Sequence, residues 1–103
     1  NNNIQIDGTL EEIMSPYPID KKFEAFNWHV ECCDGHDVTA IAAALENAKA
    51  AKGKPTVIIL NTVKGYGSPI MENKAAWHHH LPNDEEYAQI IADFAAHKEA
   101  ING

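Results

Sequence analysis

The chain opens on three consecutive asparagines, and an Asp-Gly pair follows shortly after them. An Asn side-chain oxygen, followed two residues later by a free backbone carbonyl oxygen, can give two hard ligands of the kind that Mg²⁺ and Ca²⁺ bind. These ions take few protein ligands when a phosphate shares their coordination. The run is therefore compatible with a metal–phosphate site but does not by itself indicate one. The alternative is that the asparagines only make local backbone hydrogen bonds in a turn.

Lys64 is a second candidate, in the segment Val-Lys-Gly-Tyr-Gly-Ser. Gly65 and Gly67 allow the backbone to approach a ligand closely, and the ammonium group can meet an anion. The segment has neither the glycine spacing of a P-loop nor that of a dinucleotide-binding fold. A ligand-binding loop and a plain turn after a strand are therefore both compatible with the spacing.

Three consecutive histidines, His78, His79 and His80, are the third candidate. Three adjacent side chains cannot all face one metal ion in regular structure, and zinc-binding pairs on helices are usually four residues apart. This geometry favours a single functional imidazole with two bystanders over a zinc site. His29 and His36 are interpreted as structural.

The element that must position Lys64 is the apolar, β-branched run from Val57 to Val63. Its composition predicts a strand that is buried on both faces, in the middle of a parallel sheet. Ligands of open α/β sheets bind outside the carboxyl ends of the strands. The segment from Lys64 to Ser68 is therefore where a site is expected.

Upstream of this strand, the sequence predicts another strand over residues 28–33 and a helix over residues 37–52. Gly53 is the expected C-cap of the helix. Strand, helix and strand make a βαβ unit, so the fold class is α/β with a parallel sheet. The apolar face expected on this helix consists of Val38, Ile41, Ala42 and Leu45.

Shorter helices are expected on either side of this unit. Thr9 and Glu12 have the spacing of a capping box, and Asp20 is a plausible N-cap for a helix over residues 20–26. Residues 70–82 are predicted to be a loop, and the tail from residue 97 is expected to fray. Asn83 or Asp84 caps the last predicted helix, whose apolar stripe is Tyr87, Ile90, Ile91 and Phe94.

Composition narrows the function classes. The chain has 103 residues, of which 45% are hydrophobic, enough for one modest core at most. Its net charge of −7 argues against a nucleic-acid or anionic-membrane surface. Cys32 and Cys33 are adjacent, so they are poorly placed to form a disulfide with each other, and both are predicted to be buried. Unpaired cysteines and the lack of a long apolar run favour a cytoplasmic protein. The start at Asn1, inside an apparent loop, suggests a fragment.

Taken together, these residues resemble transketolase, most closely the amino-terminal subunit of the split bacterial and archaeal type. The resemblance covers nearly the whole chain, and the segments follow one another in the family's order. It implies the carboxyl-terminal part of a thiamine diphosphate-binding domain over residues 1–103, with no second domain. The segments are NNNIQIDGTLEEIM, FEAFNWHVECCDGHDVTAIAAALENAK, GKPTVIILNTVKGYGSPIMENKAAWH and PNDEEY.

The resemblance also implies site residues. Asn2 would give its side-chain oxygen, and Ile4 its carbonyl oxygen, to Mg²⁺ (or Ca²⁺) at the diphosphate. Ile6 would lie against the cofactor ring, and Lys64 would face the cofactor. His78 would sit near the diphosphate and the reacting carbon as the catalytic imidazole. The family often has Gly after this histidine, where this chain has another His.

The implied reaction transfers a two-carbon ketol unit from a ketose phosphate to an aldose phosphate, as in the pentose phosphate pathway, with thiamine diphosphate as the electron sink. The family's Gly-Asp-Gly segment and its pyrimidine-binding domain are not in these residues, so the chain alone is expected to be inactive. A second subunit would supply that domain in an oligomer. The alternatives are a deoxyxylulose-phosphate synthase, a dehydrogenase alpha chain, or a non-catalytic α/β interaction module.

Overall fold

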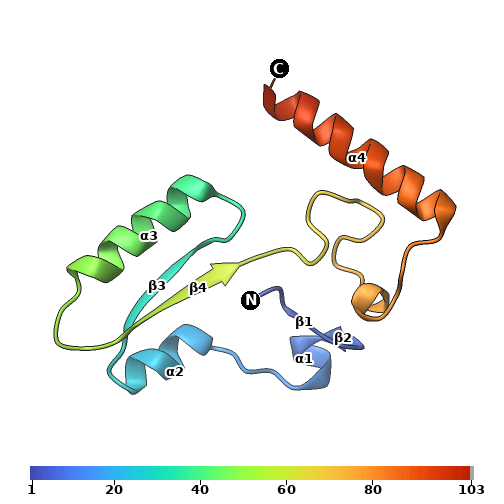
Figure 1. Ribbon diagram of the computed structural model, residues 1–103. Coiled ribbons are helices and arrows are strands. Elements are labelled where there is room, and N and C mark those ends of the chain that lie inside the picture. Colours follow the sequence, from blue (N-terminus) through green and yellow to red (C-terminus); the bar gives the residue numbers. More distant parts are fainter. Residues whose placement is uncertain (103) are drawn as a thin grey trace.

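The structure, a computed structural model, describes residues 1–102 and leaves Gly103 outside the described residues. Helices flank a small parallel sheet, and the last helix extends away from it (Figure 1). The elements in chain order are β1 (Ile4–Gln5), β2 (Gly8–Thr9), α1 (Leu10–Ile13), α2 (Ile19–Ala25), β3 (His29–Asp34), α3 (Val38–Ala50), β4 (Thr56–Asn61), the 3₁₀ helix η1 (Ala75–His78) and α4 (Asp84–Asn102).

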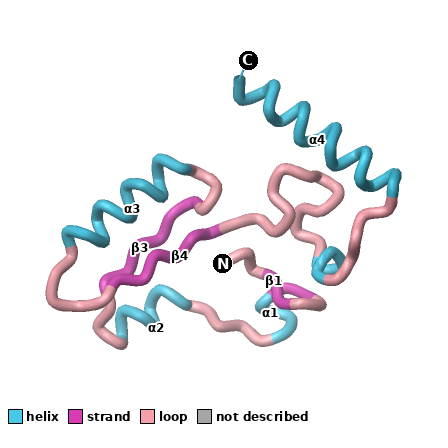
Figure 2. The backbone as a smooth tube through the Cα atoms, in the orientation of Figure 1, coloured by secondary structure: helices cyan, strands magenta, loops and turns pink. Residues whose placement is uncertain are grey.

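The centre of the fold is the unit β3–α3–β4. The two strands are parallel and stay in register from the pair His29–Thr56 to the pair Asp34–Asn61. In the view of Figure 2, α3 lies on one side of these strands and α2 on the other. The predicted βαβ unit and the α/β fold class are therefore confirmed.

The asparagine run continues the sheet on the free side of β4. The Asn1 nitrogen donates a hydrogen bond to the Leu60 carbonyl oxygen (2.8 Å), and the Thr62 N–H donates to the Asn1 carbonyl oxygen (2.9 Å). Two such bonds on either side of one residue are the pattern of a parallel ladder. Asn1 therefore occupies the position of a third strand beside β4.

The capping chemistry of the helices is partly as predicted. The capping box of Thr9 and Glu12 is present at α1, and the Asp37 carboxylate accepts from two amides at the start of α3. The N-cap of α2 is Pro18, so the prediction of Asp20 is wrong. Because Asp20 lies inside the first turn of α2, its charge faces the positive end of the helix dipole instead.

Three predictions about where elements end are corrected. Helix α3 ends at Ala50 with an extended C-cap at Ala51, so Gly53 lies in the following loop, where it adopts a φ of 81°. The segment 70–82 is irregular but contains η1. Helix α4 continues to Asn102, beyond the residue at which fraying was expected, since nothing in its sequence breaks a helix.

The apolar faces are less buried than predicted. Strand β4 is half-buried along most of its length because its sheet has few strands. The prediction for α3 chose a partly wrong face, since Ala44 is buried whereas Val38 is 81% exposed. Ile90 alone of the predicted stripe on α4 is buried. Alanines allow α3 to approach the strands closely, while the larger side chains remain uncovered.

The overall shape agrees with this pattern of exposure. The Cα radius of gyration is 17.1 Å, whereas a compact chain of this length has about 13 Å. Cys32, predicted to be buried, is exposed, and Cys33 is half-buried; both are free thiols. The burial prediction failed for Cys32 because the described residues leave that face of the sheet open.

Candidate functional site

The candidate site lies at the carboxyl end of β4. The hydrogen bonds of Asn1 to Leu60 and Thr62 hold the asparagine run beside the point where β4 ends. Lys64 follows Thr62 by two residues, so Asn2 and Lys64 leave the same end of the sheet. Both residues therefore lie outside the carboxyl ends of the strands, where ligands of open α/β sheets bind.

Asn2 and Ile4 direct oxygen atoms to one edge of the β1–β2 hairpin. The Leu10 N–H donates to the Asn3 carbonyl, which makes the next pair, Ile4 and Thr9, a non-hydrogen-bonded pair. The N–H and C=O groups of Ile4 therefore point away from β2. On that outer edge, the Ile4 N–H donates to Asn2 Oδ1 at 3.0 Å.

These two oxygens fit a small hard cation. Asn2 Oδ1 accepts one N–H and has a second lone pair, and the Ile4 carbonyl faces the same edge. The local turn expected as the alternative is therefore present as well, and it orients the Asn2 side chain. The donor set suits Mg²⁺ or Ca²⁺ but supplies only two ligands, whereas Mg²⁺ takes six.

Ile6 follows in a strained conformation. Its φ is 45°, a left-handed value that a β-branched residue rarely adopts and that costs about 1–2 kcal/mol. Its side chain is 49% exposed. Backbone strain of this kind is concentrated at ligand-binding sites. The exposed apolar surface of Ile6 is thus presented by a turn whose geometry is not the intrinsic preference of the residue.

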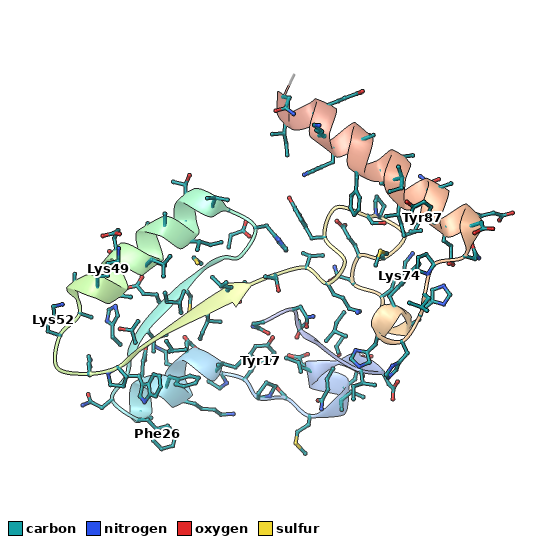
Figure 3. All side chains as sticks on the ribbon, viewed as in Figure 1. Tyr17, Phe26, Lys49, Lys52, Lys74 and Tyr87 are labelled. Carbon is teal, nitrogen blue, oxygen red and sulfur yellow. The ribbon has the colours of Figure 1, made fainter. Side chains whose placement is uncertain are left out.

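Tyr17, in the loop between α1 and α2, contacts the side chains of the asparagine run. Its hydroxyl lies 3.0 Å from Asn1 Oδ1 and 3.0 Å from Asn3 Oδ1, and it can donate to one of them at a time. Figure 3 labels Tyr17 below the start of the chain. Tyr17 lies 14 residues from Asn3, so no local pattern identified this contact. It leaves Asn2 as the asparagine of the run that Tyr17 does not hold.

The loop from Lys64 to Ser68 has two positions, Gly65 and Gly67, whose backbone conformation requires glycine. Gly65 has a φ of 71°, and a Cβ atom there would lie 2.7 Å from the Cβ and 2.9 Å from the carbonyl carbon of Met71. Gly67, with a φ of 94°, donates its N–H to Glu72 Oε1 at 3.0 Å. The two glycines are required by conformation and, at Gly65, also by close approach.

Ser68 ends this loop and is the most deeply buried polar residue, at 1% exposure. Its Oγ lies 3.5 Å from Asp93 Oδ2 of α4, and its carbonyl accepts from the amides of Met71 and Glu72. These contacts fasten the loop to the following turn and to α4. Within residues 1–102, the Lys64 ammonium forms no ion pair, so it can meet an anion outside the described residues.

Of the three histidines, His78 and His79 contact each other, whereas His80 contacts Glu86 of α4. His78, the last residue of η1, is exposed, and its ring meets that of His79 edge-on at 4.5 Å. Within residues 1–102, no hydrogen bond or ring contact joins His78 to Asn2, Ile6 or Lys64. The role of His78 therefore stays a prediction.

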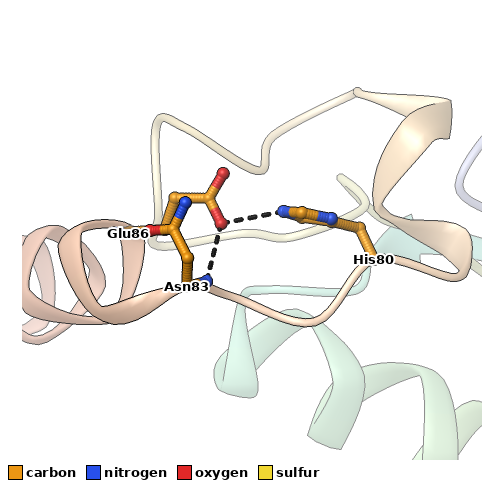
Figure 4. A network of polar contacts seen from close by, with 3 residues as sticks. All are labelled: His80, Asn83 and Glu86. Carbon is orange, nitrogen blue, oxygen red and sulfur yellow. Dashed lines mark hydrogen bonds and ion pairs between the residues drawn. The ribbon is translucent and has the colours of Figure 1, made fainter.

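His80 lies in the loop before α4 and contacts the first turn of that helix (Figure 4). Its Nε2 lies 2.8 Å from Glu86 Oε2, and the same carboxylate oxygen accepts from the Asn83 N–H at 2.9 Å. The Asn83 amide hydrogen bond, followed by that to His80, holds the pKa of Glu86 below its usual value. Asn83 is thus the N-cap residue of the two predicted, and His80 is a structural bystander.

No enclosed metal or cofactor site is complete in the described residues. No group of three or more His, Cys, Asp or Glu side chains among residues 1–102 could hold a metal ion. A hollow of about 230 Å³ beside Asn1 and Tyr17 is smaller than the roughly 300–1,000 Å³ typical of ligand pockets. In the same range, no helix is both long and apolar enough to span a bilayer.

One known protein family matches nearly the whole chain, including the candidate site. Residues 1–100 match the family described as "Transketolase, thiamine diphosphate binding domain". The chain belongs to the transketolase family. The four segments on which the resemblance rested lie within this match, and the fold class agrees with it.

Relatives and solved structures agree with this assignment. The chain is 42% identical over 92 residues to the 6-deoxy-6-sulfo-D-fructose transketolase subunit SqwG of Clostridium sp. (strain MSTE9), a match covering 89% of the chain and 34% of that subunit. It is 48% identical over 89 residues to transketolase 1 of Vibrio cholerae, covering 82% and 13%. The crystal structure of a Pichia stipitis transketolase in complex with sedoheptulose 7-phosphate superposes with a TM-score of 0.80 and 30% identity, covering 92% and 14%.

The chain thus spans about a third of the length of its split-subunit relative. Against transketolase 1 of Vibrio cholerae, it spans 13% of the length. The family assignment concerns the thiamine diphosphate-binding domain.

Proposed function

We propose that residues 1–103 are the carboxyl-terminal part of a thiamine diphosphate-binding domain in a transketolase that moves a two-carbon ketol unit between a ketose phosphate and an aldose phosphate. The observation that carries the proposal is the pair of oxygens from Asn2 and Ile4 on the outer edge of β1. The hydrogen bonds of Asn1 to β4 bring this run to the end of the sheet that Lys64 also leaves. Hard oxygen ligands at the same end of the sheet as an ammonium group suit Mg²⁺ bound to a diphosphate.

Each residue has a role in this proposal. Asn2 and Ile4 hold Mg²⁺ (or Ca²⁺) at the diphosphate, and Lys64 offsets phosphate charge. Ile6 presents apolar surface to the cofactor. His78 donates a hydrogen bond to substrate oxygens and holds or transfers a proton there, work suited to imidazole near neutral pH. Thiamine diphosphate supplies the nucleophilic carbon and the electron sink for breaking and forming the carbon–carbon bond.

We also propose that this chain needs further protein to work. Two metal ligands leave most of the Mg²⁺ coordination to other groups, and the exposed faces of α3 and α4 offer apolar surface to the rest of the domain. The Clostridium relative is itself named as a transketolase subunit, which supports an enzyme divided between two chains. In this proposal, a second subunit carries the pyrimidine-binding domain, and the two form an oligomer. The chain alone is then inactive, and a cytoplasmic location fits sugar phosphate substrates.

The test is a coupled assay of the full protein with its partner subunit, thiamine diphosphate and Mg²⁺. Sedoheptulose 7-phosphate and 6-deoxy-6-sulfo-D-fructose serve as ketol donors, with an aldose phosphate as the acceptor. Ketol transfer that requires both the cofactor and Mg²⁺ supports the proposal. Turnover of pyruvate in place of a ketose would instead assign a synthase or dehydrogenase, and absence of cofactor binding would leave an α/β interaction module.

A further inference from the structure

His36 lies in the turn between β3 and α3. This turn is at the same end of the sheet as the segment that carries Lys64, and the two are in contact. Its Nε2 accepts a hydrogen bond from the Val63 N–H at 2.8 Å. Its ring stacks on that of Tyr66, with the centroids 3.8 Å apart and the planes at 11°. One imidazole therefore contacts the residue before Lys64 and a residue two positions after it.

The hydrogen bond fixes the protonation state of this imidazole. A backbone N–H can only donate, so Nε2 of His36 must be the acceptor and the ring proton must be on Nδ1. The His36 backbone N–H donates to Asp34 Oδ1 at 2.8 Å, which holds the turn. His36 is neutral as long as the Val63 bond exists.

The far side of the same stack reaches α4. The Tyr66 ring meets the His97 ring edge-on, with the centroids 6.0 Å apart and the planes at 84°. Tyr66 thus lies between the turn before α3 and the last helix. The loop carries this tyrosine although 48% of the residue is exposed, so hydrophobic burial alone does not explain its position.

We propose that His36 is a positioning residue for the loop from Lys64 to Ser68, acting as a neutral hydrogen-bond acceptor for Val63 and as a stacking platform for Tyr66. The inference rests on the proposed function in that it matters for catalysis only if Lys64 faces the diphosphate. The contact itself does not depend on the cofactor. Loss of the acceptor would release the Val63 end of the segment that holds Lys64.

The acceptor role separates this proposal from simple packing. If Nε2 of His36 were protonated, its N–H group would face the Val63 N–H, and the hydrogen bond between them would be lost. Protonation of this ring should therefore release the loop. The ionisable groups around His36 are Asp34 and Asp37 in its own turn, Tyr66 in the loop and, across that ring, His97. The Asp37 carboxylate is occupied by the first amides of α3.

The test is hydrogen–deuterium exchange of peptides covering residues 62–68 in the full protein without cofactor, corrected for intrinsic rates at each pH. His36→Phe keeps a stacking ring but has no acceptor, whereas His36→Gln keeps an acceptor near the position of Nε2. We expect exchange to be about two- to tenfold faster in His36→Phe than in the wild type, the range of one net hydrogen bond. His36→Gln should restore most of the protection, and His29→Phe is the control.

The pH dependence supplies an independent readout. Once acidification has protonated the His36 ring, as followed by its NMR ring-proton shifts, the wild type should exchange like His36→Phe, and His36→Gln should not change under the same conditions. Equal protection in the Phe and Gln variants, or a wild-type loop insensitive to pH, would overturn the proposal. Thiamine diphosphate binding is measured separately: a loop that responds as expected in a protein that binds no cofactor would refute the proposed function and leave the role of His36 standing.

Discussion

Gly65 and Gly53 form a matched pair for testing whether the loop of Lys64 needs close backbone approach. Both have a positive φ, 71° and 81°. Alanine at either position costs about 1–2 kcal/mol for the left-handed conformation. At Gly53 nothing lies within 4 Å of the added Cβ atom, whereas at Gly65 that atom meets the backbone of Met71 at 2.9 Å.

The clash adds an overpacking cost of about 1–3 kcal/mol to Gly65→Ala. We therefore expect Gly53→Ala to lower the free energy of unfolding by about 1–2 kcal/mol and Gly65→Ala by about 2–5 kcal/mol. Urea denaturation of the full protein measures both values, and calorimetric titration with thiamine diphosphate and Mg²⁺ measures binding. Only Gly65→Ala should weaken binding, because it moves Lys64. Equal losses of stability and equal affinities in the two variants would refute the reasoning.

Two further predictions concern helix ends. Asp37→Ala removes the acceptor for two amides of α3 and should lower the free energy of unfolding by about 1–2 kcal/mol in urea denaturation, with Asp37→Ser recovering most of it. The pKa of Glu86 is lowered, first by the Asn83 amide and then by His80. Its stabilisation of α4 is thus complete above the unfolded-chain pKa of about 4.3 and is lost as the pH falls through the lower folded value. Hydrogen exchange of α4 should rise with this acidification in the wild type and stay flatter in Glu86→Gln, and an identical pH response in both would contradict the assignment.

The sequence predicted the parts of the fold that depend on local chemistry. Thr9 with Glu12, Asp37 before α3, and the β-branched run of β4 all carry short-range signals, and the structure has the corresponding caps and strand. The parallel pairing of β3 and β4 followed from their spacing around one helix.

Burial could not be predicted in the same way. Val38 and Cys32 are apolar side chains whose burial depends on what covers them, and the sequence of one segment does not contain its partners. The face of α3 that packs is set by alanines, which periodicity underrates because larger apolar residues dominate the pattern.

The residues of the candidate site likewise fall into those that the sequence predicted and those that it did not. Asn2, Ile4 and Lys64 follow from an asparagine run and a glycine-rich loop, and the hydrogen bonds of Asn1 to β4 bring these segments to one end of the sheet. Tyr17 and His36 act over 14 and 27 residues in sequence, respectively, through contacts that no spacing rule encodes. The likeness to transketolase provided the reaction, which the residue pattern alone did not.

The central claim is that Asn2 belongs to an Mg²⁺–diphosphate site, and the most direct measurement is the Mg²⁺ dependence of thiamine diphosphate binding by the full protein. Asn2→Ala should raise the Mg²⁺ concentration at half-maximal binding by about tenfold or more, since even outer partners of metal ligands contribute 10- to 100-fold. Asn3→Gly, which keeps the positive φ of Asn3 and removes its side chain, should change it little. Equal effects of the two variants, or binding of the cofactor that does not depend on Mg²⁺, would contradict the claim.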